Sequence, residues 1–220
     1  MLNKKDIISY DLSNMYDSIK GMDSQIIDSI KIMENFKSIS INCNNVIICG
    51  MGGSAIGADF VKNIVSQSIN IPIYVNRTYV LPKWVNSKSL VILCSYSGDT
   101  EETISCYEET LSRKIDPIII TSNGFLLRES NKHNFQKIKL PIGMQPRVAF
   151  GYSSSVLLIL LQKLNLIDNK LIDDLTKIIE NIKQTSEMFS DFTSNNNKAL
   201  NLASNIYDKY PIIYSTPLTE

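Results

Sequence analysis

Two short loops contain the residue types in this 220-residue chain that are best suited to hold an anion. The first, Gly50-Met51-Gly52-Gly53-Ser54, follows the apolar run Val46–Cys49 and precedes a segment with a helical pattern. We call it the glycine loop. Glycines let the backbone turn sharply and approach an anion closely, and the start of a helix offers unpaired N–H groups with a positive dipole end. The loop therefore predicts an anion site.

The glycine loop alone does not decide which anion is bound. Gly50-x-Gly52-x-x-Ala55 also satisfies a loosened dinucleotide fingerprint. The second strand ends in Val75-Asn76-Arg77, without the acidic residue that holds the ribose of NAD, although Arg77 would suit the 2′-phosphate of NADP. An NADP-binding enzyme therefore stays open as an alternative. A Walker loop is excluded, since no Gly-Lys-Ser/Thr follows the glycines.

The second loop, Ser95-Tyr96-Ser97-Gly98-Asp99-Thr100, follows the apolar run Leu90–Cys94. We call it the hydroxyl loop. Ser95, Ser97 and Thr100 fall within one tight turn at a helix start, where short hydroxyls and free amides form a neutral cradle for a phosphate dianion. The alternative is ordinary helix capping by Asp99 or Thr100. Capping explains one of these residues but not the whole set.

Composition excludes several classes of function. Lys+Arg 22 against Asp+Glu 22 gives no net charge, which argues against a nucleic-acid partner. No apolar run approaches the roughly 20 residues that cross a bilayer, and the N-terminus lacks the apolar core of a signal peptide. We therefore expect no membrane association.

The cysteines and the single histidine point to a cytoplasmic protein without a metal. Cys43, Cys49, Cys94 and Cys106 show no CxxC spacing, so we interpret them as reduced core thiols. His133 is the only histidine and lies in a polar stretch, which favours a solvated surface position and gives a zinc site little to build on.

Short apolar runs alternate with stretches of helix length, which is typical of a parallel sheet covered on both faces. We predict an α/β fold with a doubly wound, five-stranded parallel sheet. The expected strands are Val46–Cys49, Ile71–Val75, Leu90–Cys94, Pro117–Ile120 and Phe135–Leu140. Expected helices include residues 11–37, Ala55–Gln67 and Thr100–Lys114.

The pattern changes after Arg147. Helical patterns cover residues 153–164, 171–189 and 198–209, and residues 211–215 read as a new strand. We predict four parts: an N-terminal helical segment (1–37), a first α/β domain (38–150), a helical linker (151–209) and the start of a truncated second domain (210–220).

Three stretches carry a resemblance to a known family. Gly-Met-Gly-Gly-Ser-Ala-Ile-Gly at 50–57, Ser-Tyr-Ser-Gly-Asp-Thr-Glu-Glu-Thr at 95–103 and Gln-Pro-Arg-Val-Ala at 145–149 resemble the bifunctional phosphoglucose/phosphomannose isomerases, which are SIS-domain sugar isomerases. The resemblance implies two SIS domains in tandem within a homodimer. It also implies a hexose 6-phosphate substrate and no metal or cofactor.

The resemblance assigns roles to matching residues. Gly53 and Ser54 line the substrate site, Ser95, Ser97 and Thr100 hold the phosphate, and Arg147 is catalytic. Arg147 is expected near C1 and C2 of the sugar, where a fixed guanidinium stabilises the negative charge of an enediolate. The alternative interpretation of this arginine is an ordinary ion pair at the surface.

The implied reaction is the interconversion of glucose 6-phosphate or mannose 6-phosphate with fructose 6-phosphate. The glutamate base, the histidine and the lysine that the resemblance implies are expected after Glu220, so we expect this chain to be truncated and inactive alone. The alternative function is a phosphosugar-binding SIS module without catalysis.

Overall fold

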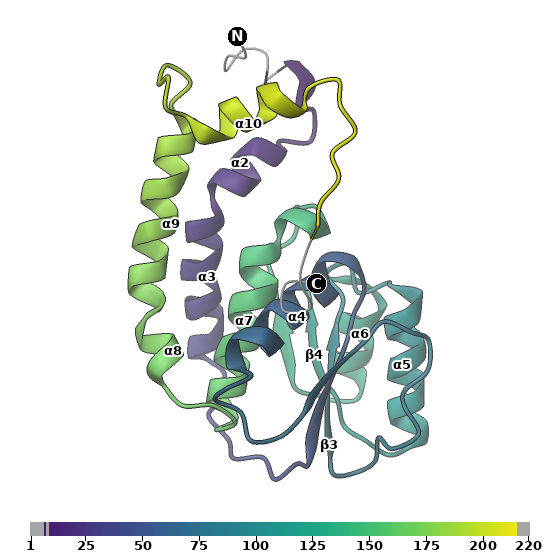
Figure 1. Cartoon of the computed structure of the whole chain (residues 1–220). Coiled ribbons are helices and arrows are strands. Elements are labelled where there is room, and N and C mark those ends of the chain that lie inside the picture. The colour runs from purple at the N-terminus through teal and green to yellow at the C-terminus, as the bar shows by residue number, and fades with distance from the viewer. Residues whose placement is uncertain (1–6, 8, 215–220) are drawn as a thin grey trace.

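A five-stranded sheet forms the centre of the protein. The structure, a computed structural model, describes residue 7 and residues 9–214, except the side chains of residues 171–172. All neighbouring strands are parallel, in the order β2-β1-β3-β4-β5, and helices cover both faces (Figure 1). The strands are β1 (Asn45–Cys49), β2 (Ile73–Asn76), β3 (Ser89–Cys94), β4 (Ile118–Thr121) and β5 (Lys137–Lys139). The predicted α/β, doubly wound fold is confirmed.

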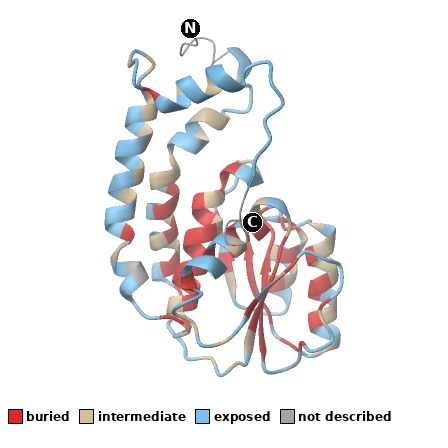
Figure 2. Ribbon diagram, in the orientation of Figure 1, coloured by how far each residue is buried: buried red, intermediate tan, exposed pale blue. Residues whose placement is uncertain are grey.

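Alternate residues of the central strands enter two separate cores. In β1, Val46 and Ile48 belong to one hydrophobic cluster, whereas Ile47 and Cys49 belong to the other. Both sets are buried because the sheet is covered on both faces, so the strand reads as a continuous apolar run. Figure 2 shows this burial concentrated in the strands and in the helices beside them.

One helix follows each of three strands. These helices are α4 (Gly52–Val65) after β1, α5 (Glu101–Ser112) after β3 and α6 (Gly124–Lys132) after β4. α4 packs in the first core through Ala58, Val61 and Val65, whereas α5 and α6 pack in the second core. α4 begins three residues before the expected Ala55, so the last glycines of the glycine loop form its first turn.

A buried helix and an N-terminal pair complete the first core. α7 (Phe150–Lys163) has buried side chains around most of its circumference and packs against α3 (Met22–Glu34) and α4. α2 (Met15–Lys20) precedes α3. The single helix expected over residues 11–37 is therefore wrong: α2 and α3 are separated at Gly21 (φ −84°, ψ 21°), whose ψ lies outside the α-helical range.

The remaining helices extend away from the sheet. α8 (Lys170–Asp173), α9 (Leu175–Ser190) and α10 (Lys198–Ile206) follow α7, with α9 beside α3 and α10 beyond the end of α9 (Figure 1). One helix expected over residues 171–189 is thus two helices, separated at Asp174. The helix expected at 198–209 ends at Ile206.

The strand expected at 211–215 does not form in its described part. Residues 211–214 lie in no strand, and the side chains of Ile212, Ile213 and Tyr214 are exposed. A strand needs a hydrogen-bonded neighbour, and this segment pairs with none of the described strands. Ser215 lies outside the described residues. The four-part division of the chain stays a prediction, although burial places α7 in the core of the sheet unit.

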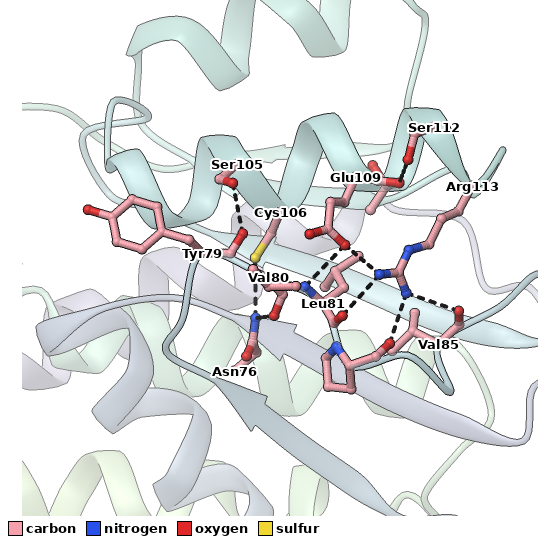
Figure 3. Close-up of polar contacts among 12 residues, drawn as sticks. Asn76, Tyr79, Val80, Leu81, Val85, Ser105, Cys106, Glu109, Ser112 and Arg113 are labelled. Atoms are coloured by element: carbon pink, nitrogen blue, oxygen red, sulfur yellow. Dashed lines mark hydrogen bonds and ion pairs between the residues drawn. The ribbon is translucent and has the colours of Figure 1, made fainter.

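A polar network fastens the connection between β2 and β3 onto α5 (Figure 3). The Arg113 guanidinium donates to the carbonyl oxygens of Leu81 (3.0 Å), Pro82 (2.8 Å) and Val85 (3.2 Å) and pairs with Glu109. At the other end of the connection, the buried Asn76 amide donates to the carbonyls of residues 78 and 80. This connection, which contains no helix, is therefore held in place by side chains.

None of the described helices is both long and apolar enough to cross a membrane. The buried cysteines were interpreted correctly: Cys49, Cys94 and Cys106 are buried free thiols, and Cys43 is half-buried. Burial raises the pKa of Cys94 to about 12. His133 is exposed and stacks on Phe135, as expected for a surface residue.

Candidate functional site

The two anion loops meet at the carboxyl ends of two neighbouring strands. The glycine loop follows β1 and the hydroxyl loop follows β3, and these strands are adjacent although β2 lies between them in sequence. From β1 the chain runs outward to β2, and from β3 it runs outward the other way to β4 and β5. Ligands of doubly wound sheets bind at such a switch in direction.

The structure brings the three predicted hydroxyls of the hydroxyl loop together. Ser95 Oγ lies 2.8 Å from Thr100 Oγ1 and 3.5 Å from Ser97 Oγ. Ser95 Oγ also accepts a hydrogen bond from the amide of Gly98 at 3.0 Å, and Ser97 Oγ accepts one from the amide of Asp99 at 3.2 Å. Ser95 is buried, Thr100 is half-buried and Ser97 is exposed, so the cluster opens toward solvent at Ser97.

The capping alternative for this loop is wrong. Thr100 occupies the N-cap position of α5, but no side chain caps that helix. The Thr100 hydroxyl bonds to Ser95 instead, and the Asp99 carboxylate accepts a hydrogen bond from the amide of Phe125 at 2.8 Å, at the start of α6. The start of α5 therefore keeps the positive dipole end and amide donors that favour an anion.

The segment after β4 supports the hydroxyl loop from behind. Ser122 Oγ donates to the carbonyl of Tyr96 at 2.6 Å. Gly98 (φ +77°) and Gly124 (φ +77°) are interlocked, because a Cβ on Gly98 would collide with the Asn123 carbonyl and a Cβ on Gly124 with the Ser97 carbonyl. Only glycine allows this close approach in the left-handed region. These contacts hold the hydroxyl loop in this conformation without the help of a ligand.

The glycine loop packs against the segment that contains Arg147. A Cβ on Gly53 would lie 2.6 Å from the carbonyl oxygen of Pro146, so the first turn of α4 touches this segment directly. On its other side, a Cβ on Gly50 would lie 2.9 Å from the Cys94 carbonyl, just before the hydroxyl loop. The glycine loop is therefore the wall between the hydroxyl loop and Arg147.

Arg147 lies in a short 3-10 turn, η1 (Pro146–Val148), and is exposed. It has no hydrogen bond or ion pair with any described residue, so the interpretation as an ordinary surface ion pair is not supported within that part of the chain. An unpaired guanidinium beside an anion loop is available to a ligand.

A small cavity of about 10 Å³ marks the junction of the three segments. Its lining includes Ser54 from the glycine loop, Tyr96 from the hydroxyl loop and Pro146 beside Arg147. A volume of this size holds about one water molecule, so the three segments are closely packed where they meet. The site residues predicted from sequence thus come from segments that contact one another.

Two further residues belong to this region, and sequence reasoning did not assign them. The Tyr96 hydroxyl donates to the Pro141 carbonyl at 2.7 Å and accepts from the Met144 amide at 3.1 Å. Asp99, to which no chemistry was given, connects the hydroxyl loop to α6. The only signal for Tyr96 was an aromatic residue between two serines of a tight turn.

Acidic side chains at the start of α5 point away from the hydroxyl cluster. Glu101 Oε2 accepts a hydrogen bond from the Tyr79 hydroxyl at 3.4 Å. The negative charge of Glu102, followed by desolvation and by Glu101, raises the pKa of Tyr79. These carboxylates thus face the connection between β2 and β3.

The NADP alternative depends on Arg77, which already has a partner. Arg77 forms an ion pair with Asp59 of α4. A carboxylate beside the guanidinium repels a 2′-phosphate, and Gly53 is covered by the Pro146 backbone rather than open to a pyrophosphate. The geometry therefore counts against an NADP site at the glycine loop.

Comparison with known proteins identifies the family. The SIS domain model matches residues 40–164, which include β1 to β5, both loops and α7. This chain belongs to the SIS domain family. The match begins shortly before β1 and ends just after α7, so the buried helix α7 is part of the matched SIS domain.

The chain is also similar to longer curated proteins. It is 38% identical over 207 residues to a bifunctional phosphoglucose/phosphomannose isomerase of Caldicellulosiruptor bescii, covering 91% of this chain and 60% of that protein. It is 39% identical over 175 residues to the protein of the same name from Aquifex aeolicus, covering 79% and 51%. The chain therefore spans about half to three-fifths of the length of these relatives.

A solved structure shows the same fold at low sequence identity. The hypothetical protein TT0462 from Thermus thermophilus superposes with a TM-score of 0.64 at 15% identity, over 91% of this chain and 50% of that one. The SIS fold is thus shared well beyond the range of recognisable sequence similarity.

Proposed function

We propose that this SIS domain binds a hexose 6-phosphate as part of a phosphoglucose/phosphomannose isomerase. The observation that carries the proposal is the convergence of the Ser95, Ser97 and Thr100 hydroxyls at the uncapped start of α5. The relatives of that name from Caldicellulosiruptor bescii and Aquifex aeolicus are similar over 91% and 79% of this chain, which supports the choice of substrate.

In this proposal the phosphate dianion lies on the hydroxyl loop. Ser97 and Thr100 donate hydrogen bonds to its oxygens, Ser95 orients the hydroxyl of Thr100 at 2.8 Å, and the first amides of α5 add donors. The sugar extends past the wall formed by Gly53 and Ser54. The close approach of Gly53 to the Pro146 backbone, next to Arg147, supports such a course of the sugar from the phosphate toward the guanidinium.

The proposed reaction converts an aldose into a ketose through an enediolate. A base takes the proton from C2 of glucose 6-phosphate or mannose 6-phosphate and returns it to C1, while the hydroxyl proton on the C2 oxygen passes to the C1 oxygen, which yields fructose 6-phosphate. Negative charge develops on the oxygens of C1 and C2 during this transfer. Arg147 stabilises that charge because its guanidinium has no competing carboxylate among the described residues. No metal and no cofactor enter the proposal.

Isothermal titration of this chain with fructose 6-phosphate tests the binding step. We expect saturable binding that Ser97→Ala and Thr100→Val both weaken. Absence of binding to fructose 6-phosphate and glucose 6-phosphate would overturn the proposal. NADPH serves as the comparison ligand, and NADPH affinity that Arg77→Ala abolishes would support the dinucleotide alternative instead.

A chimera tests the catalytic step. Residues 1–209 of this chain, followed by the remaining C-terminal part of the Caldicellulosiruptor bescii relative, restore the length of that relative. In a coupled assay we expect turnover of glucose 6-phosphate or mannose 6-phosphate, and Arg147→Ala should lower kcat far more than it raises KM. Binding without turnover in the chimera would support a non-catalytic phosphosugar-binding module.

The proposal includes a homodimer in the cytoplasm. Free thiols at all four cysteines suit a reducing compartment.

The homodimer is supported by an apolar stripe on α4. The stripe consists of three exposed side chains at four-residue spacing, Ile56, Phe60 and Ile64, and provides a surface for contact with a second copy. Light scattering after gel filtration measures the mass. We expect a dimer that Phe60→Ser weakens, and a monomer at all concentrations would contradict this part.

A further inference from the structure

One side chain of the hydroxyl loop reaches the segment that leads to Arg147. We call residues 141–149 the arginine segment. The Tyr96 hydroxyl donates to the carbonyl of Pro141 and accepts from the amide of Met144, at 2.7 and 3.1 Å. Both bonds join parts of the chain that are 45 and 48 residues apart in sequence. Burial raises the pKa of Tyr96, so its hydroxyl stays protonated and able to donate at neutral pH.

The arginine segment has few other anchors. After Arg147, the buried Gln25 amide donates to the carbonyl of Val148 at 2.9 Å. Beneath it, the first turn of α4 touches the Pro146 backbone at Gly53. Before Arg147, the Tyr96 hydroxyl is the side-chain anchor, and the guanidinium itself has no partner among the described residues. Directly after Arg147, Val148 and Ala149 are buried, and the Ala149 carbonyl accepts a hydrogen bond from the Ser153 amide of α7 at 3.0 Å. The backbone is therefore fixed on the C-terminal side of Arg147 by this packing, and on its N-terminal side Tyr96 is the side-chain anchor among the described residues.

Tyr96 is also fixed at its own backbone. It lies between Ser95 and Ser97, and its carbonyl accepts bonds from the Ser122 hydroxyl at 2.6 Å and the Ser122 amide at 3.0 Å. Tyr96 as a whole is 9% exposed and belongs to the first core. A ring held this firmly transmits a shift of the hydroxyl loop to the arginine segment instead of absorbing it.

We propose that Tyr96 is a positioning residue that couples phosphate binding at the hydroxyl loop to the placement of Arg147. This inference rests on the proposed function, because it assigns a route between the two ends of the same phosphosugar site. The Tyr96 ring joins the loop that holds the phosphate to the backbone that holds the guanidinium. A buried tyrosine that only fills the core would instead affect folding and every ligand alike.

Two ligands separate these roles. Fructose 6-phosphate is neutral at C1 and C2, whereas 6-phosphogluconate places a carboxylate at C1, where a guanidinium at Arg147 meets negative charge. Titration calorimetry then compares the wild-type protein, Tyr96→Phe, Arg147→Ala and the double variant. Tyr107→Phe is the matched control, because this buried tyrosine also loses a hydroxyl bond, to Glu129, on the opposite face of the sheet.

We expect Tyr96→Phe to weaken the binding of 6-phosphogluconate about three- to tenfold, which is the scale of one or two lost neutral hydrogen bonds. Fructose 6-phosphate affinity should change less than twofold, and in the Arg147→Ala background the effect on 6-phosphogluconate should disappear. Tyr107→Phe should leave both affinities unchanged. Amide exchange at Met144 should be faster in Tyr96→Phe than in Tyr107→Phe.

Three results would overturn the inference and leave the proposed function standing. In Tyr96→Phe, the affinity for both ligands could fall equally, or the affinity for 6-phosphogluconate could remain unchanged. The third result is a loss of affinity for 6-phosphogluconate that persists undiminished in the Arg147→Ala background. If the wild-type protein binds neither ligand, the proposed function fails and this inference fails with it, so the two failures are distinguished by the wild-type titration.

Discussion

At the scale of single residues, the hydroxyl loop presents its three side chains at graded depth. Ser95 is buried, Thr100 is half-buried and Ser97 is exposed, and Ser95 lies within 3.5 Å of both others. The buried serine therefore organises the cluster, while the exposed one meets the ligand first. Substitution of Ser95 should disturb the loop itself, whereas substitution of Ser97 should remove the proposed phosphate contact and the two weaker contacts of Ser97 Oγ, with the Asp99 amide at 3.2 Å and with Ser95 Oγ at 3.5 Å.

We expect Ser97→Ala to weaken fructose 6-phosphate binding by about 1–2 kcal/mol, the scale for a lost hydrogen bond to a charged group. Titration calorimetry measures this change. Ser112→Ala is the control, because Ser112 lies at the far end of α5 and bonds only to the carbonyl of Glu109. Unchanged affinity in Ser97→Ala would mean that the loop has only a structural role.

Gly98 should be far less tolerant of substitution than a glycine of similar backbone conformation. In Gly98→Ala the new Cβ meets the Asn123 carbonyl and Thr121 Oγ1, so we expect the free energy of unfolding to fall by more than about 3 kcal/mol. In Gly143→Ala (φ +97°) nothing lies within 4 Å of the new Cβ, and about 1–2 kcal/mol of strain is expected. Urea titration compares the two, and equal losses would contradict the interlocked geometry.

Residue types and spacing singled out the hydroxyl loop and the glycine loop, and the family resemblance singled out Arg147, but neither indicated what holds these segments together. The hydroxyls of the loop lie within six residues of one another, so their meeting follows from a single turn. Tyr96 instead bonds to residues 45 and 48 positions away, and Gly53 meets a carbonyl at residue 146. Such contacts depend on the packing of α4 and α7 beside the sheet, which local patterns do not report.

At the scale of elements, the connection between β2 and β3 differs from the connections after β1, β3 and β4, because it contains a polar network instead of a helix. Arg113 bonds to three carbonyls of this connection and to Glu109, so its planar fork satisfies several backbone groups at once (Figure 3). A lysine has no such fork and reaches fewer acceptors. The second core depends on this arrangement, because Leu81 and Val85 of the connection are buried in it.

Arg113→Lys should therefore lower the free energy of unfolding by about 1–2 kcal/mol, since two or more buried carbonyls lose their partner. Urea titration measures the loss, with Arg128→Lys in α6 as the control. An effect no larger than that of the control would show that the network contributes nothing to stability.

The ends of elements were predicted best for strands that are buried on both faces of the sheet. β1 and β3 read as continuous apolar runs and formed within a residue or two of their expected ends. The edge strand expected at Phe135–Leu140 shortened to Lys137–Lys139, because only one side has a partner strand. The helix boundaries at Gly21 and Asp174 lie within stretches whose apolar residues keep a helical spacing. The spacing of apolar residues therefore did not predict them.

At the scale of the whole molecule, two buried tyrosines connect distant helices. The Tyr107 hydroxyl of α5 donates to Glu129 of α6, and the Tyr152 hydroxyl of α7 donates to Asp28 of α3. Burial, reinforced by these carboxylates, raises the pKa of each tyrosine to about 12. Between pH 10 and about pH 12, both phenols are thus neutral in the folded protein and ionised in the unfolded chain.

The stability that these tyrosines contribute is fully present below pH 10, the ordinary tyrosine pKa, and is lost as the pH rises toward 12. We expect the free energy of unfolding to fall across this window, by up to about 2.7 kcal/mol for each tyrosine. Denaturant titrations at a series of pH values measure the slope. The double variant Tyr107→Phe/Tyr152→Phe should make the slope shallower but not abolish it, because the pKa of Cys94 is also raised, to about 12. An unchanged slope in that variant would contradict the assignment.

The connection between β2 and β3 has a consequence for how the chain could be divided. Lys88 is exposed just before β3, while the residues upstream of it are clamped to α5 by Arg113 and Asn76 holds the end of β2. Cleavage after Lys88 would leave β1 still paired with β3 along the length of both strands. Two separate polypeptides would then reassemble into one sheet. One would contribute the glycine loop, and the other would contribute the hydroxyl loop and Arg147, so that the proposed binding of a hexose 6-phosphate would report on their association.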